Sequence, residues 1–73
     1  MSHVVMAEMV ASVSEVVAGP GDIVEPTDVL AILESMKMEI PVLAEVAGVV
    51  REVTVIEGDV VSEGDSIAVI DES

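Results

Sequence analysis

The sequence predicts a small all-β domain, an antiparallel sandwich or barrel, and three observations lead to this fold class. Val is the commonest residue, hydrophobic residues make up 52% of the chain, and Phe, Trp and Tyr are absent. The core must therefore be aliphatic and rich in β-branched side chains, which favour strands. Short apolar runs alternate with Gly, Pro and Asp, a pattern typical of strands joined by turns. The chain also repeats itself at an offset of 37 residues.

The internal repeat aligns residues 4–35 with residues 41–72 without a gap. Eleven of these 32 pairs are identical, where residue frequencies predict roughly four. The identical residues in the first copy are Val5, Ala7, Glu8, Val13, Glu15, Val16, Gly21, Asp22, Val24, Asp28 and Ala31. Two copies are too few for a solenoid, so we expect two interlocked halves of one domain.

Each half reads as four short strands. In the first half we expect strands at 3–7 (HVVMA), 10–17 (VASVSEVV), 22–24 (DIV) and 28–34 (DVLAILE). In the second half we expect them at 40–44 (IPVLA), 48–55 (GVVREVTV), 60–61 (VV) and 66–71 (SIAVID). The segments GPGD and EGD are turns, because Gly and Pro adopt the backbone angles that turns need. No helix is expected, since no window keeps its apolar residues on one helical face.

The charge and size restrict the classes of partner. The formal net charge is −13, and Lys37 and Arg51 are the only fixed positive charges. Nucleic acids and anionic membrane surfaces are therefore poor partners, whereas a basic protein is allowed. No apolar run approaches the ~20 residues of a membrane helix, and the N-terminus does not read as a signal peptide. We expect a single cytoplasmic domain spanning residues 1–73.

Enzyme active sites are not predicted from the residues present. The chain has no Cys and one His, His3, which has no motif partner. No Ser lies in a G-x-S-x-G motif, and neither zinc-site nor EF-hand spacing occurs. Asp22, Asp59 and Asp65 lie beside glycines and are interpreted as turn residues.

The single lysine, Lys37, lies between Met36 and Met38. In the repeat, residue 36 corresponds to residue 73 and residue 40 to residue 3. A two-fold relation would therefore place Lys37 at a hairpin tip, opposite the chain ends. A surface lysine and two core methionines would be the simplest interpretation. A tight hairpin turn cannot bury the side chains of Met36, Lys37 and Met38 together, however, so at least one methionine should be exposed. Exposed apolar groups beside a lone amine indicate a surface that other proteins recognise, and such an amine can be acylated.

The segment ESMKMEIPVLAEVAGVV resembles the biotin attachment motif, which usually reads Ala-Met-Lys-Met before a strand and a glycine. The Gly-Asp pairs at 21–22 and 58–59 match the spacing of the same family. Over nearly its whole length the chain is similar to biotinyl domains of the biotin carboxyl carrier type, in the biotinyl/lipoyl attachment family. Ser35 replaces the usual Ala, and Ala11 stands where Gly is common. No thumb insertion lies between Val13 and Val24.

This resemblance implies a flattened β-barrel of two four-stranded sheets with pseudo-two-fold symmetry. Biotin protein ligase would attach biotin covalently to Lys37 on the exposed hairpin turn. Met36 and Met38 would shape recognition by partner enzymes. The domain would be a non-catalytic carrier, monomeric in isolation, which moves a carboxyl group between biotin carboxylase and carboxyltransferase sites.

Two alternatives remain open at this point. A lipoyl carrier has the same fold, but its tip usually reads Asp-Lys-Ala, so Met36 and Met38 argue against it. An unmodified acidic interaction module could retain the fold without a carrier function.

Overall fold

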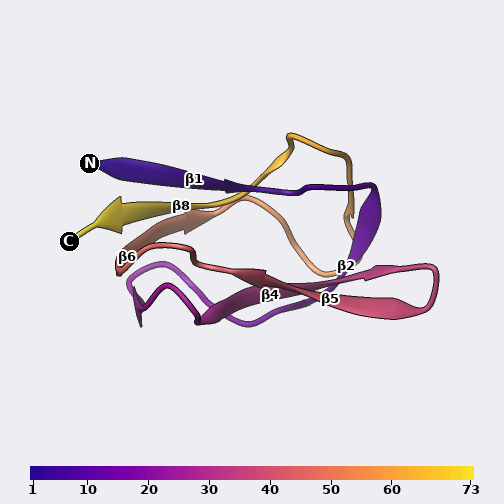
Figure 1. The fold of residues 1–73 in the computed structure, drawn as a ribbon, viewed down its shortest axis with the longest axis horizontal. Coiled ribbons are helices and arrows are strands. Elements are labelled where there is room, and N and C mark those ends of the chain that lie inside the picture. Colours follow the sequence, from indigo (N-terminus) through magenta and orange to yellow (C-terminus); the bar gives the residue numbers. More distant parts are fainter.

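The computed structural model describes all 73 residues, and its regular elements are all β-strands (Figure 1). The strands are β1 (Ser2–Met6), β2 (Ala11–Val16), β3 (Ile23–Val24), β4 (Val29–Ser35), β5 (Met38–Leu43), β6 (Gly48–Val53), β7 (Val60–Val61) and β8 (Ser66–Glu72). The structure contains no helix that could span a membrane. The predicted all-β fold class is confirmed.

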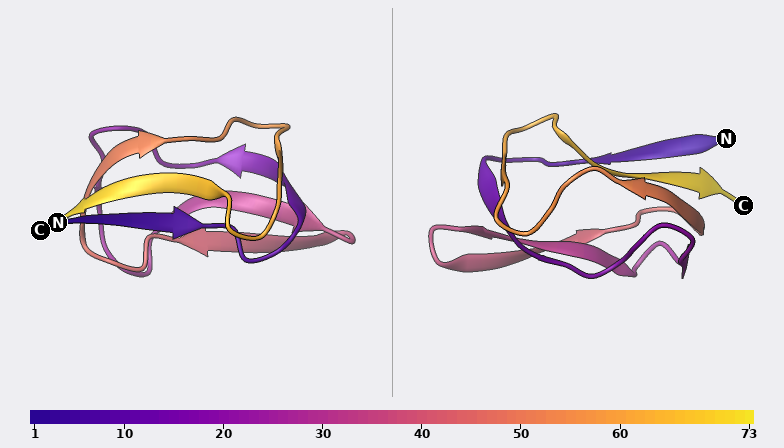
Figure 2. Two further views of the ribbon diagram at one scale, coloured as in Figure 1. Left: turned by 90° about the horizontal axis from the view of Figure 1, so that it is seen from above. Right: turned by 180° about the vertical axis from the view of Figure 1, so that it is seen from behind.

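The strands form two four-stranded antiparallel sheets. One sheet has the order β1-β8-β6-β3 and the other has the order β5-β4-β2-β7. Adding 37 to the residue numbers converts β1, β2, β3 and β4 into β5, β6, β7 and β8, so the pseudo-two-fold relation exchanges the two sheets. The molecule measures 35 × 18 × 17 Å, so it is elongated with a nearly round cross-section, as two further views of it show (Figure 2). The predicted pair of four-stranded sheets is therefore confirmed.

Backbone hydrogen bonds connect the two repeat halves, and they occur in reciprocal pairs. The Gly21 amide donates to the Val50 carbonyl at 2.8 Å, and its repeat counterpart, the Gly58 amide, donates to the Val13 carbonyl at 2.9 Å. Both glycines have positive φ, 93° and 97°, a conformation that residues with a Cβ adopt only with strain. Because each half completes the hydrogen bonding of the other, the halves are interlocked as the repeat predicted.

Four aspartates close the turns in one common way. In each turn the aspartate carboxylate accepts a hydrogen bond from the amide three residues before it, at 2.8 or 2.9 Å. The aspartate's own amide donates back to the carbonyl of that same residue. The four residues are Asp22, Asp28, Asp59 and Asp65. The interpretation of Asp22, Asp59 and Asp65 as turn residues is thereby confirmed.

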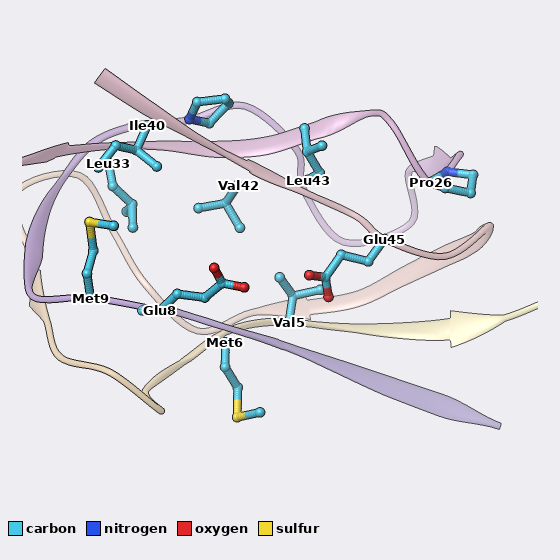
Figure 3. Close-up of a pocket in the computed structure, with 12 residues that line it drawn as sticks. Val5, Met6, Glu8, Met9, Pro26, Leu33, Ile40, Val42, Leu43 and Glu45 are labelled. Carbon is cyan, nitrogen blue, oxygen red and sulfur yellow. The ribbon is translucent and has the colours of Figure 1, made fainter. Parts of the chain in front are cut away.

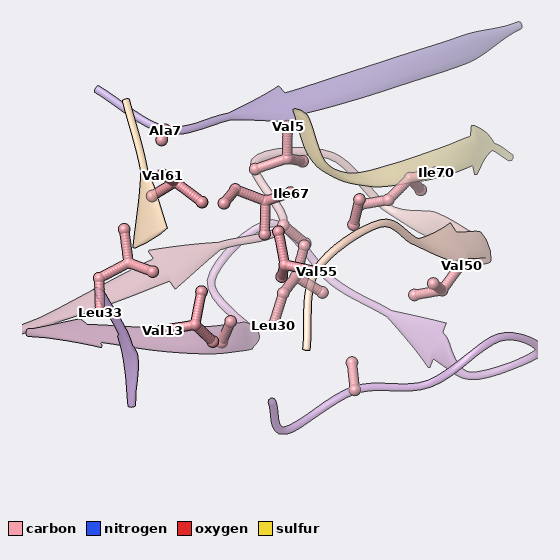
Figure 4. Close-up of a cluster of buried hydrophobic side chains, with 14 of the residues drawn as sticks. Val5, Ala7, Val13, Leu30, Leu33, Val50, Val55, Val61, Ile67 and Ile70 are labelled. Carbon is pink, nitrogen blue, oxygen red and sulfur yellow. The ribbon is translucent and has the colours of Figure 1, made fainter. Parts of the chain in front are cut away.

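The core follows the same two-fold relation. Sixteen hydrophobic residues are buried, and no polar or charged residue is. Fourteen of them form seven repeat-related pairs: Ala7/Ala44, Val13/Val50, Ala18/Val55, Val24/Val61, Leu30/Ile67, Ala31/Ala68 and Leu33/Ile70. Their aliphatic side chains meet between the two sheets (Figure 4). Burial of this apolar surface is the main stabilising contribution available to a chain without disulfides.

Candidate functional site

The hairpin formed by β4 and β5 positions the candidate site. Ser35 pairs with Met38 across the two strands, which leaves Met36 and Lys37 as the central residues of a two-residue turn. Both have positive φ, 51° for Met36 and 67° for Lys37. Positive φ at both central positions defines the type I′ turn, whose twist matches that of the flanking strands. The backbone therefore presents Lys37 on a tightly defined turn.

The turn is shorter than the sequence led us to expect. We predicted that the second strand of the hairpin would begin at Ile40, but β5 begins at Met38. The difference arises because pairing continues to the last residue before the turn. Type I′ turns are usually signalled by Asn-Gly, and a Met-Lys pair carries no such signal.

Lys37 lies at the far end of the molecule from the chain termini. Figure 1 shows the β4–β5 hairpin projecting at one end, while the N- and C-termini lie together at the other. The hairpin-tip position that the repeat predicted is therefore correct. Lys37 is exposed and makes no ion pair. Met36 and Met38 are 92% and 65% exposed, so both methionines, and not just one, face solvent.

The arms of the hairpin below the tip are acidic. Glu34 on β4 and Glu39 on β5 are direct cross-strand partners, and both are exposed. Facing like charges destabilise a hairpin slightly, so the pair does not serve to hold the arms together. It surrounds the lone cation of the tip with negative charge, and it would favour a basic partner surface.

The other two basic side chains, Arg51 and His3, lie elsewhere and are paired. The Arg51 guanidinium donates to the Asp71 carboxylate, and this hydrogen bond and the attraction between the charges raise the pKa of Arg51. His3, a residue of β1, lies with its Nε2 2.8 Å from Oε1 of Glu45. Both pairs are partly exposed to solvent, so they contribute little to stability. Lys37 is thus the one basic side chain without a carboxylate partner.

A groove opens between the edge strands β1 and β5, with a volume of about 360 Å³. Val5 and Val42 line it, and the repeat-related carboxylates of Glu8 and Glu45 reach into it (Figure 3). We did not expect this groove from the sequence. The repeat aligns Val5 with Val42 and Glu8 with Glu45, but this equivalence does not show that the aligned residues face each other across a groove.

The reactive group of the site is the amine of Lys37. No group of three or more His, Asp or Glu side chains could hold a metal ion. The methionines and the lysine that the sequence singled out come together at the tip, whereas His3 lies on β1 in the other sheet. An exposed, unpaired amine without catalytic neighbours is suited to acylation by a separate enzyme.

Comparison with known proteins gives a family match over most of the chain. Residues 3–70 match the family described as biotin-requiring enzyme. The chain is also 60% identical over 43 residues to the "Biotinylated protein TB7.3" of Mycobacterium tuberculosis (strain ATCC 25618 / H37Rv). That alignment covers 59% of this chain and 61% of the relative, which is less than two thirds of the relative's length.

Solved structures of two kinds have a similar fold. The Kluyveromyces lactis urea carboxylase superposes with a TM-score of 0.91 and 35% identity, over 97% of this chain and 6% of that protein. The lipoyl domain of the 2-oxoglutarate dehydrogenase complex from Azotobacter vinelandii superposes with a TM-score of 0.73 and 30% identity. In this case 88% of this chain and 81% of the other are covered.

Proposed function

This chain belongs to the family of biotin-requiring enzymes, and from that membership we propose that it is a non-catalytic biotinyl carrier domain with Lys37 as its attachment residue. The observation that carries this proposal is the β4–β5 turn. It holds the only lysine of the chain, exposed and unpaired, between two exposed methionines. We further propose that residues 1–73 act as one carrier unit.

The geometry of the tip fits a covalently bound arm. The amine must be reached from outside, and no neighbouring side chain covers or pairs with it. Forming an amide removes the positive charge of Lys37 and changes the formal net charge from −13 by one unit, to −14. Because the side chain already lies in solvent, little needs to rearrange when the amide forms.

The residues of the tip would have different roles in modification. Lys37 Nζ would supply the nucleophile, and Met36 and Met38 would supply apolar area that the modifying enzyme buries. Biotin, when bound, supplies a ring that can accept and give up a carboxyl group. The hairpin would hold the attachment point away from the body of the domain. A tethered group then visits partner active sites at a high effective concentration.

We propose three partners for this surface: a biotin protein ligase, a biotin carboxylase and a carboxyltransferase. The similarity to a urea carboxylase supports partners of the carboxylase class. The negative charge beside the tip, from Glu34 and Glu39, supports docking surfaces that carry Lys or Arg.

A lipoyl carrier is the second candidate, and the similarity to a lipoyl domain favours keeping it. The fold does not separate the two, because both kinds of domain share it. The methionines distinguish the two kinds of domain. Met36 and Met38 stand where the lipoyl motif has Asp and Ala, so we propose biotin as the attached group ahead of lipoate.

The test is modification in vitro. The purified chain is incubated with a biotin protein ligase, biotin and ATP, and in parallel with a lipoate ligase, lipoate and ATP. We expect one biotin on the peptide containing Lys37 and none on the Lys37→Arg variant, by peptide mass spectrometry. Lys37→Arg keeps the charge and should unfold at the parent's temperature. Biotin found on that variant, or loading by lipoate alone, would contradict the proposal.

A further inference from the structure

Methionine sulfur is the main target that this chain offers to two-electron oxidants. The sequence contains five Met and no Cys, Trp or Tyr. Peroxides and hypochlorite convert an exposed methionine thioether into a sulfoxide, a polar group that methionine sulfoxide reductases can reverse. Oxidation of this chain is therefore directed to its methionines, and the exposure of each sulfur decides which react first.

The two methionines of the tip are well placed to react. Met36 is 92% exposed and Met38 is 65% exposed, compared with 53% for Met6 and 42% for Met9. Only Met1, at the chain terminus, is more open than Met36. Neither tip methionine belongs to the buried core or to the partly buried residues that pack against it. A sulfoxide at either position would therefore leave the core packing unchanged.

Both sulfurs lie in side chains directly adjacent to Lys37. Met36 shares the two-residue turn with the lysine, and Met38 is the first residue of β5. A protein that reaches the lysine amine must cover these neighbours. An apolar thioether gains free energy when it is covered, whereas a sulfoxide oxygen must first give up its hydrogen bonds to water.

We propose that Met36 and Met38 are oxidation sites and that their sulfoxides block loading of Lys37. In the reaction with hydrogen peroxide, each sulfur loses two electrons to the peroxide. The O–O bond breaks, one oxygen forms the sulfoxide S=O bond, and the other leaves as water. The inference rests on the proposed function, because it requires that loading buries the two methionines.

The experiment compares loading before and after oxidation. The parent chain is treated with hydrogen peroxide, the peroxide is removed with catalase, and peptide mass spectrometry identifies which methionines gained one oxygen. Ligase, biotin and ATP are then added. We expect Met36 and Met38 to be oxidised before Met6 and Met9, and kcat/KM for loading to fall by at least about tenfold. Treatment with both stereospecific sulfoxide reductases should restore the rate.

Two leucine variants locate the effect. Met6→Leu/Met9→Leu is the matched control: it should load like the parent and remain sensitive to peroxide. Met36→Leu/Met38→Leu lacks the sulfur at the tip, so its own rate should be the same before and after peroxide. Its melting temperature should match the parent's.

Two results would overturn the inference. One is an oxidised parent that loads at the untreated rate, and the other is a Met36→Leu/Met38→Leu variant that peroxide still inhibits. Failure of the untreated parent to accept biotin is a separate result, which would count against the proposed function itself. In that event the order of oxidation of the methionines would still be measured by mass.

Discussion

Gly48 illustrates how closely the strands approach one another in this domain. A Cβ built on Gly48 would lie 2.1 Å from the backbone carbonyl oxygen of Asp71 on β8. Real Cβ atoms do not come so close, and the obstructing atom is backbone, which cannot swing aside as a side chain can. The repeat counterpart of Gly48 is Ala11, which begins β2 as a buried residue. The first half therefore tolerates a methyl group that the second half excludes.

We predict that Gly48→Ala lowers the free energy of unfolding by about 3 kcal/mol, because overpacking forces the backbone to move. Urea unfolding measures the change. Gly19→Ala is the matched control: apart from its chain neighbours, no residue has an atom within 4 Å of the place that its Cβ would take, so it should stay within about 1 kcal/mol of the parent. Equal effects of the two substitutions would show that the close approach to Asp71 is unimportant.

The β4–β5 hairpin combines a conformational strain with the candidate site. Residues other than Gly, Asn and Asp adopt positive φ with a free-energy penalty, and this turn contains two such residues, Met36 and Lys37. Natural two-residue hairpins more often use Asn-Gly at these positions. The strain is located at the residues to which we assign the function, a pattern seen at many functional sites.

We predict that Met36→Asn/Lys37→Gly raises the free energy of unfolding by about 1–2 kcal/mol while abolishing biotinylation. Chemical denaturation followed by circular dichroism measures the first effect, and mass spectrometry measures the second. Lys37→Arg controls for loss of the amine without relief of strain, so it should gain no stability. An Asn-Gly variant no more stable than the parent would mean that the turn is not strained.

The sequence predicted the strands and the position of Lys37, but it did not predict the start of β5 or the groove. The repeat identified, for each strand of one half, the equivalent strand of the other half, because equivalent residues fill equivalent places in the core, as Leu30 and Ile67 do. It also placed Lys37 opposite the termini. It could not predict the start of β5 at Met38, since the turn lacks Asn-Gly. The groove with Glu8 and Glu45 arises only when the edge strands of two sheets meet, which local sequence does not encode.

At the scale of the whole molecule, negative charge dominates. Fifteen carboxylates oppose two fixed cations on a body only 35 × 18 × 17 Å in size. At ~0.01 M salt the screening length is about 30 Å, comparable with the longest dimension, whereas at ~1 M it is about 3 Å. The carboxylates therefore repel one another across the whole molecule at low salt, and this repulsion favours the expanded unfolded chain.

We predict that raising NaCl from ~0.01 M to ~1 M increases the melting temperature by about 4–8 °C, the shift expected from ~1 kcal/mol in a domain of this size. Calorimetry or thermal circular dichroism measures the shift. The Glu34→Gln/Glu39→Gln variant removes two facing charges and should respond less to salt. A melting temperature that falls with salt would mean that the few ion pairs outweigh the repulsion.

The pairing of β1 with β8 has a consequence for the connectivity of the fold. The Glu72 amide donates to the Met1 carbonyl at 2.7 Å, so β1 and β8 meet at the termini much as β5 and β4 meet at the Met36–Lys37 turn. The ends thus occupy the place of a second hairpin. A circularly permuted chain, joined between residues 73 and 1 and opened at the present turn, would exchange the two poles.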